Sequence, residues 1–154
     1  MTDTPYWTRV VIPALLRHAR TTYGTAMRRA LAEVDCEDMP RNGLYVIGAL
    51  AMGEAPLSEI IRDLGVSKQA AGQLVDTLVL RGYLEREVDA ADRRRLTVGL
   101  TERGKAAAAA QAAAREAVDA ALVARVGEEK VLHAREVLGT LIDMGHERPD
   151  GAGD

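Results

Sequence analysis

The stretch from Leu57 to Gly104 constrains the fold more than any other part of the chain, because small polar residues and glycines divide it at short intervals. Ser58 is predicted to accept a backbone hydrogen bond at the start of one helix, and Gly65 to end that helix in a left-handed conformation. Ser67 is predicted to cap a second helix, which Gly82 stops. Two helices joined by a tight turn that contains glycine predict a helix-turn-helix.

The segment that follows Gly82 is predicted to form a two-stranded antiparallel ribbon. Residues 83–88 and 95–100 show the period-2 alternation of a half-buried pair, with inward-pointing side chains expected at Leu84, Val88, Leu96, Val98 and Leu100. The connection between the strands, residues 89–94, is too long for a tight two-residue hairpin. We therefore expect a protruding wing.

Helices are predicted on both sides of this stretch. Thr4-Pro5 should open a short helix through Val11, which Pro13 should kink or restart. Apolar residues at helical spacing predict longer helices over residues 13–34, 41–52, 102–126 and 128–144. Thr101 is the expected N-cap of the alanine-rich helix 102–126, and Gly127 its breaker. Because alanine side chains are small, this helix is expected to pack closely against another helix.

The remaining segments are predicted to be connections. Residues 35–42 read as a polar loop that contains Cys36, and Pro56-Leu57 as a short extended bridge. The fold class expected is mainly α with a small antiparallel β-wing, built as a single domain over residues 1–154. No apolar run is long enough to span a bilayer. A single cysteine permits no internal disulfide and fits a reducing cytoplasm.

Charge is distributed unevenly along the chain, although its net value is only −3. Residues 62–105 carry nine Lys or Arg against seven Asp or Glu, whereas residues 1–61 carry six against seven and residues 106–154 carry five against nine. The helix-turn-helix and wing therefore lie in the only net-positive third. The negative net charge of the whole chain argues against a nucleic-acid partner. The positive net charge of residues 62–105 is nevertheless compatible with DNA binding by that segment.

The second helix of a helix-turn-helix enters the DNA major groove, and its first turn meets base edges. Ser67, Lys68, Gln69, Gln73 and Thr77 are therefore candidate DNA-binding residues, since Lys donates to guanine and Gln pairs with adenine. Each could equally be a solvent-facing helix residue, and Ser67 is more securely a cap. Arg93, Arg94 and Arg95 form the densest charge run, which is either a solvated turn or an insertion into the minor groove. Arg94 could instead pair with Asp92 and brace the wing.

Two motifs in this stretch resemble the MarR family of bacterial winged helix-turn-helix transcription regulators. They are Asp89-x-x-Asp92-x-Arg94, in the wing, and Leu100-Thr101-x-x-Gly104, at the entry to the following helix. The segment LGVSKQAAGQLVDTLVLRGYLER also looks like the recognition-helix block of that family. Ala90 stands where the family often has Pro, which should loosen the wing turn.

The resemblance implies a homodimer in which residues 1–36 and 102–146 form dimerisation helices around a DNA-binding lobe of residues 41–101. The apolar stripes of the first and last helices support this, since one small domain would struggle to cover them. A dimer would place two recognition helices about one DNA turn apart, which predicts a palindromic operator. The resemblance also implies a repressor that is released by a small aromatic or phenolic compound.

A site for such a compound is less well marked in the sequence. Trp7, His18, Tyr23 and Tyr45 are candidates for lining the pocket, although each could be plain core or interface. Cys36 lies among acidic residues that disfavour a reactive thiolate, so a redox role is not expected. The three histidines lack metal-ligand spacing, so we expect no metal and no cofactor.

Together these patterns predict a cytoplasmic, ligand-responsive transcription regulator that binds double-stranded DNA. A second interpretation is a winged-helix module that binds protein partners without DNA, which the net negative charge favours. An enzyme is the least favoured class, because the chain has no glycine-rich phosphate loop, nucleophile elbow or paired metal motif.

Overall fold

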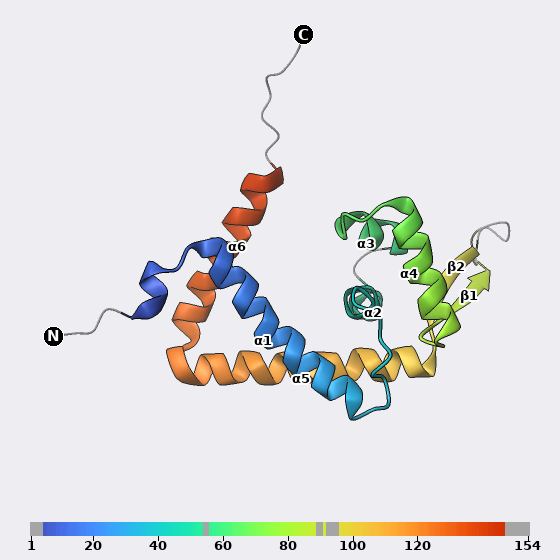
Figure 1. The fold of residues 1–154 in the computed structure, drawn as a ribbon, viewed down its shortest axis with the longest axis horizontal. Coiled ribbons are helices and arrows are strands. Elements are labelled where there is room, and N and C mark those ends of the chain that lie inside the picture. The colour runs from blue at the N-terminus through green and yellow to red at the C-terminus, as the bar shows by residue number, and fades with distance from the viewer. Residues whose placement is uncertain (1–4, 54–55, 89–90, 92–95, 147–154) are drawn as a thin grey trace, which may run out of the picture. The chain divides into compact units, whose positions relative to one another are not determined.

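The computed structural model describes residues 5–53, 56–88, 91 and 96–146. It confirms a mainly helical chain with one small antiparallel ribbon (Figure 1). In chain order its elements are a 3₁₀ turn η1 (Tyr6–Arg9), then α1 (Ile12–Ala32), α2 (Gly43–Met52), α3 (Leu57–Asp63), α4 (Lys68–Leu80), β1 (Leu84–Val88), β2 (Leu96–Leu100), α5 (Glu102–Val126) and α6 (Glu128–His146). The chain divides into two compact units, residues 1–115 and 116–154, and α5 contributes to both.

The helix-turn-helix of the first unit follows from local residue choices. The Oγ atom of Ser67 accepts a hydrogen bond from the backbone N–H of Ala70 at 3.2 Å, which satisfies one free donor at the start of α4. Gly65 and Gly82 adopt φ angles of 64° and 74°, a left-handed conformation that ends each helix at little steric cost. The predicted cap and both predicted stops are confirmed.

The predicted start of α3 is wrong by one to two residues. Pro56 is the N-cap, with an extended backbone, and Leu57 is already helical, so Ser58 lies inside the helix and caps nothing. The physical reason is that proline fixes its own φ and needs no hydrogen-bond partner for its nitrogen, so the helix can begin directly after it. The extended bridge is therefore Pro56 alone within the described residues.

The ribbon pairs β1 with β2 in the predicted antiparallel sense, with Leu84 opposite Leu100 and Val88 opposite Leu96. Leu84 is buried, and Val98 and Leu100 are half-buried, as their alternation predicts. Val88 is the exception, because its side chain is 59% exposed. The ribbon extends beyond the helices that cover it at Leu84. At its far end, the alternation of apolar and polar residues therefore no longer predicts which side chains are buried.

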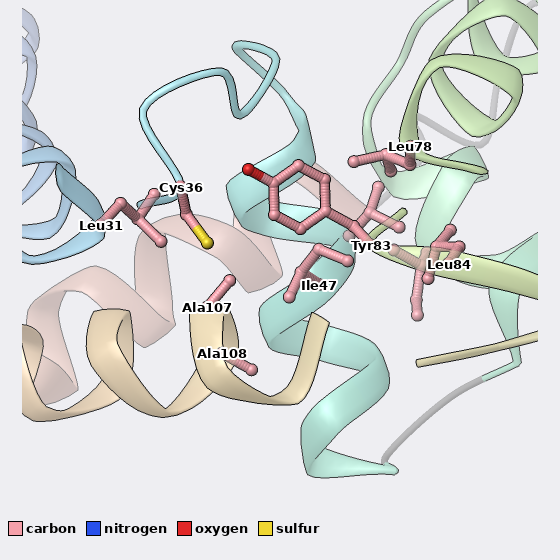
Figure 2. Packing of buried hydrophobic residues seen from close by; sticks show 10 residues of the cluster. Leu31, Cys36, Ile47, Leu78, Tyr83, Leu84, Ala107 and Ala108 are labelled. Carbon is pink, nitrogen blue, oxygen red and sulfur yellow. The ribbon is translucent and has the colours of Figure 1, made fainter. Parts of the chain in front are cut away.

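The core of the first unit gathers side chains from every helix of that unit and from β1. Its buried members are Leu31, Cys36, Val46, Ile47, Ile60, Leu78, Tyr83, Leu84, Ala107 and Ala108. Figure 2 shows the Tyr83 ring at the centre of this cluster, with its hydroxyl group directed away from Leu78 and Leu84. Burying ten such residues supplies the main stabilising term of the lobe.

Alanines on α5 allow the close helix approach predicted from their size. Ala107 and Ala108 are buried against the core, and one turn later the Nε2 atom of Gln111 donates a hydrogen bond to the Leu44 carbonyl at 3.0 Å. Gly48 makes room for this amide, because a Cβ there would lie 2.5 Å from Gln111 Nε2. Helices α2 and α5 therefore meet through small residues and one satisfied buried amide.

The second unit consists of residues 116–126 of α5, the turn at Gly127 and α6. Gly127 has a φ of 86° and ends α5 at the predicted residue. No residue of the described range 116–146 is buried. The apolar side chains left exposed on α6 are Leu132, Val137, Leu138, Leu141, Ile142 and Met144. Among the helices that the structure describes, none combines the length and apolar character needed to cross a membrane.

Candidate nucleic-acid interface

Helix α4 has one buried face and one exposed polar face, which is the geometry expected of a recognition helix. Ala71, Val75 and Leu78 are buried in the lobe. Lys68, Gln69 and Gln73 are all exposed, as their helical spacing predicts. The buried face holds the helix rigidly, so these three side chains are presented from a fixed backbone.

Ser67 and Thr77 have less freedom to contact a ligand. The Ser67 hydroxyl is occupied as the cap of α4. Thr77 is half-buried, and its hydroxyl donates to the Gln73 carbonyl at 2.7 Å, so only its lone pairs are left for another contact. The predicted wing residues Asp92, Arg93, Arg94 and Arg95 lie outside the described residues.

An ion pair that sequence reasoning missed joins the recognition helix to the ribbon. Asp76 is on the exposed side of α4, and its Oδ1 atom lies 2.6 Å from Nη2 of Arg86 on β1. The pair is mostly exposed, so it adds at most about 1 kcal/mol to stability. Its electrostatic effect is more useful, because it neutralises a carboxylate that would otherwise repel phosphates beside the exposed face of α4.

A second polar group, which we call the Asp38 cluster, surrounds the end of α4. It consists of Asp38 from the loop between α1 and α2, Arg81 and Tyr83 just after α4, and Arg103 in the first turn of α5. Asp38 Oδ1 accepts hydrogen bonds from the Tyr83 hydroxyl and from Nη2 of Arg103, the latter at 2.9 Å. The Arg103 guanidinium also lies over the Tyr83 ring, 4.3 Å from its centroid.

Backbone carbonyls complete this cluster. Arg81 donates to the Asp38 carbonyl, and Arg103 donates to the carbonyls of Arg81 and Asp35, the latter at 2.8 Å. The bonds to Asp38 and Asp35 join segments 43 to 68 residues apart in the sequence. No local pattern identifies them, because each partner alone looks like an ordinary surface charge.

The electrostatics of the Asp38 cluster follow from these contacts. The hydrogen bond from Tyr83, and after it the Arg103 guanidinium, holds the pKa of the Asp38 carboxyl below its ordinary value. Burial, reinforced by the bond to Asp38, raises the pKa of the Tyr83 hydroxyl well above its ordinary value. Both shifts keep the pair as carboxylate and neutral phenol across the neutral pH range.

The lowered pKa of Asp38 predicts that the difference in stability between the wild type and Asp38→Asn depends on pH. A depressed carboxyl pKa contributes stability above the unfolded-state value of about 3.9, and this contribution is lost as pH falls through the folded-state value. The advantage of the wild type over Asp38→Asn in urea unfolding should therefore be constant from about pH 5 to 8 and shrink below about pH 4. Glu37→Gln, at the neighbouring exposed position, is the control and should show no such step. A constant difference down to about pH 3 would contradict this assignment.

A small cavity of about 140 Å³ is formed by residues of α1, of the loop between α1 and α2, and of α2. Its lining residues are Arg28, Leu31, Cys36, Glu37, Met39, Pro40, Arg41 and Leu44. None of the four predicted pocket residues contributes to it. Trp7 is 53% and Tyr45 50% exposed, His18 is exposed, and Tyr23 is half-buried, so their role in a ligand site stays a prediction.

Cys36 is buried, although it stands between acidic residues in a loop predicted to be polar. Its side chain is 1% exposed, and its thiol donates to the Val34 carbonyl at 3.3 Å. A loop residue is buried here because Asp35, at a φ of 56°, turns the chain back over the end of α1. Within residues 5–53, 56–88, 91 and 96–146, no cluster of His, Cys, Asp or Glu could hold a metal ion.

A sequence match to a family model covers most of the winged helix-turn-helix. Residues 37–95 match the sequence model of the MarR family. The winged helix-turn-helix of this chain is therefore similar to that of the MarR family. MarR-family proteins are transcription regulators rather than enzymes, which confirms the prediction that this chain is not an enzyme.

Solved structures show the same fold. The DNA complex of MepR from S. aureus aligns with a TM-score of 0.69 and 19% identity, over 88% of this chain and 99% of that one. MepR bound to ethidium bromide, also from S. aureus, aligns with a TM-score of 0.57 and 19% identity, over 89% and 98%. YusO from Bacillus subtilis aligns with a TM-score of 0.55 and 22% identity, over 86% and 92%. No curated protein matches the chain by sequence.

Proposed function

We propose that this MarR-like chain is a sequence-specific DNA-binding transcription regulator that acts in the cytoplasm. The observation that carries the proposal is α4, which presents Lys68, Gln69 and Gln73 to solvent from a capped helix whose opposite face is buried. A helix of this kind fits the major groove, where Lys reads guanine and Gln reads adenine. The similar MepR fold, solved with DNA, supports the same use of the fold.

The regulator is proposed to act as a homodimer on a palindromic operator. The exposed apolar side chains of α6 support this, because soluble monomers seldom leave such a surface uncovered. The first unit also exposes Tyr6, Trp7, Val11 and Ile12 near its N-terminal end. Two copies related by a twofold axis would read two half-sites one helical turn apart.

Release by a small ligand is the remaining part of the proposal. MepR has been solved with ethidium bromide, a flat aromatic cation, and the family resemblance implies aromatic or phenolic effectors. In this chain Trp7, His18, Tyr23 and Tyr45 remain the candidate contacts. The regulator is proposed to repress its target and to leave the operator when such a ligand binds.

A nuclease footprint on the DNA upstream of the gene tests the central claim. We expect one protected region with twofold symmetry, salt-sensitive binding, and weaker protection when a phenolic or flat aromatic compound is added. Absence of any protected region, at concentrations where the protein is folded and dimeric, would reject DNA regulation. Unchanged protection with every compound would reject only ligand release.

The second candidate function is a winged-helix module that binds a protein. The net charge of −3 favours it, because DNA-binding domains are often basic. It predicts a partner in pull-down experiments and no footprint. The footprint therefore separates the two candidates.

Gln73→Ala is expected to relax the preference for one base pair in each half-site. Gln73 is exposed on α4, and a bidentate contact with adenine contributes roughly 1–3 kcal/mol of discrimination. Site selection from a randomised operator library measures this as a flattened position. Thr25→Ala, at an exposed position on α1, is the control. A profile identical to that of the wild type would remove Gln73 from the base-reading residues.

A further inference from the structure

The end of recognition helix α4 is held from outside the helix-turn-helix. The chain reverses at Gly82, whose φ is 74°, and the three carbonyls of residues 81–83 all accept side-chain hydrogen bonds. Thr101 donates to the carbonyls of Gly82 and Tyr83, and Arg103 donates to that of Arg81. The first turn of α5 therefore fixes the path by which the chain leaves α4.

Asp38 joins this arrangement to the loop between α1 and α2. Its carboxylate accepts from Tyr83 and Arg103, and its backbone carbonyl accepts from Arg81. One residue of the loop thus contacts the other three members of the Asp38 cluster. Since Tyr83 is buried in the core, its hydroxyl gives Asp38 a firm attachment point within the lobe (Figure 2).

We propose that Asp38 is a positioning residue for DNA reading, which sets the orientation of α4 through Arg81, Tyr83 and Arg103. The proposal rests on the DNA-binding function proposed above. Asp38 lies in the loop between α1 and α2, and its partners Arg81, Tyr83 and Arg103 are not candidate base readers. It acts because hydrogen bonds to bases tolerate only small displacements, so a loosened helix end weakens specific contacts before it unfolds the lobe.

The exposure of the Asp38 and Arg103 side chains explains why replacing Asp38 should affect DNA recognition more than the stability of the fold. The side chains of Arg103 and Asp38 are 37% and 46% exposed, so their ion pair adds little to global stability. The apolar core beneath them stays intact when Asp38 is changed. What is lost is the side-chain link from the loop to Tyr83 and Arg103, whereas the bond from Arg81 to the Asp38 backbone carbonyl remains.

Two variants at this position separate charge from hydrogen bonding. Asp38→Ala removes every side-chain acceptor, whereas Asp38→Asn keeps an oxygen at the position of Oδ1. We expect Asp38→Ala to weaken operator binding about tenfold or more, comparable to losing a base contact. Affinity for an unrelated duplex should stay within about twofold, because no phosphate-facing charge changes. Asp38→Asn should recover much of the operator affinity, and Glu37→Gln should bind like the wild type.

Fluorescence anisotropy with the footprinted operator and with a scrambled duplex measures both affinities. Circular dichroism establishes that each variant is folded. Should Asp38→Ala fail to fold, Tyr83→Phe removes only the hydroxyl and should show the same selective loss. Operator affinity equal to the wild type, or a parallel loss on both duplexes by folded protein, would overturn the proposal.

A readout without DNA distinguishes failure of this inference from failure of the proposed function. Hydrogen exchange of the amides at residues 77–83 should speed up in Asp38→Ala relative to those of α3, and Glu37→Gln should leave them unchanged. Unchanged exchange at residues 77–83 overturns the positioning role. If the wild type binds no DNA while exchange changes as expected, the DNA-binding function fails and Asp38 still positions α4.

Discussion

Replacing Gly104 by alanine is expected to destabilise the DNA-binding lobe strongly, although it adds only one methyl group. Gly104 is buried in the first turn of α5, where an added Cβ would lie against the Tyr83 carbonyl oxygen, far inside van der Waals contact. It would also come within 3.1 Å of Leu100 Cδ2. The Tyr83 carbonyl cannot move away freely, because it accepts hydrogen bonds from the Thr101 amide and hydroxyl at 3.2 Å each. We expect a loss of about 3 kcal/mol or more.

Urea unfolding followed by circular dichroism measures this loss. Gly72→Ala is the matched control, because Gly72 lies exposed within α4 and nothing stands within 4 Å of an added Cβ. Alanine favours helix over glycine, so this control should be unchanged or stabilised by up to about 1 kcal/mol. Equal unfolding midpoints for the two variants would show that α5 and the backbone at Tyr83 can separate at no cost, contrary to the close approach of Gly104 to the Tyr83 carbonyl.

Local signals in the sequence are sufficient to predict most helix boundaries. Helix α5 has the predicted bounds, because Thr101 donates and accepts at its start and Gly127 ends it with a positive φ. Ser67 and Gly82 delimit α4 in the same way. The error at Ser58 has a local cause as well, since Pro56 is the competing start signal and lies only two residues earlier.

Long-range contacts are the part that local patterns do not predict. Arg103 and Asp38 lie 65 residues apart, and Gln111 reaches a carbonyl 67 residues away, so their pairing depends on how α5 packs on the lobe. Cys36 is buried for the same reason, although its neighbours are acidic. Asp76 and Arg86 pair only because the ribbon folds back beside α4.

The residues proposed to act in DNA binding also differ in whether local sequence patterns predict them. The exposure of Lys68, Gln69 and Gln73 follows from helical periodicity, and the structure agrees. The Asp38 cluster, by contrast, could be identified only from the folded structure. The aromatic residues proposed for a ligand site were chosen by type rather than by position, and none of them lines the cavity beside Cys36.

Removing two wing arginines is expected to produce the largest change in DNA binding. Arg93 and Arg95 belong to the densest basic run of a chain whose net charge is −3, and their loss removes two of the nine Lys or Arg of residues 62–105. In the proposed complex each contacts a phosphate or the minor groove, and each such contact contributes about 0.9 to the slope of log affinity against log salt. Arg93→Ala combined with Arg95→Ala should therefore weaken binding about 10- to 100-fold at low salt and flatten the slope by up to about 1.8 for each subunit.

Anisotropy titrations at several salt concentrations, on the operator and on a scrambled duplex, measure the slope directly. The loss should be similar on both duplexes, because phosphate contacts carry little sequence information. Arg17→Ala combined with Arg20→Ala removes the same charge from exposed positions on α1 and should leave the slope unchanged. A flattened slope in both double variants would mean that net charge alone governs binding. A slope unaffected by the wing variant would remove Arg93 and Arg95 from the phosphate contacts and leave basic residues outside the wing, such as Lys68 on α4, to supply them.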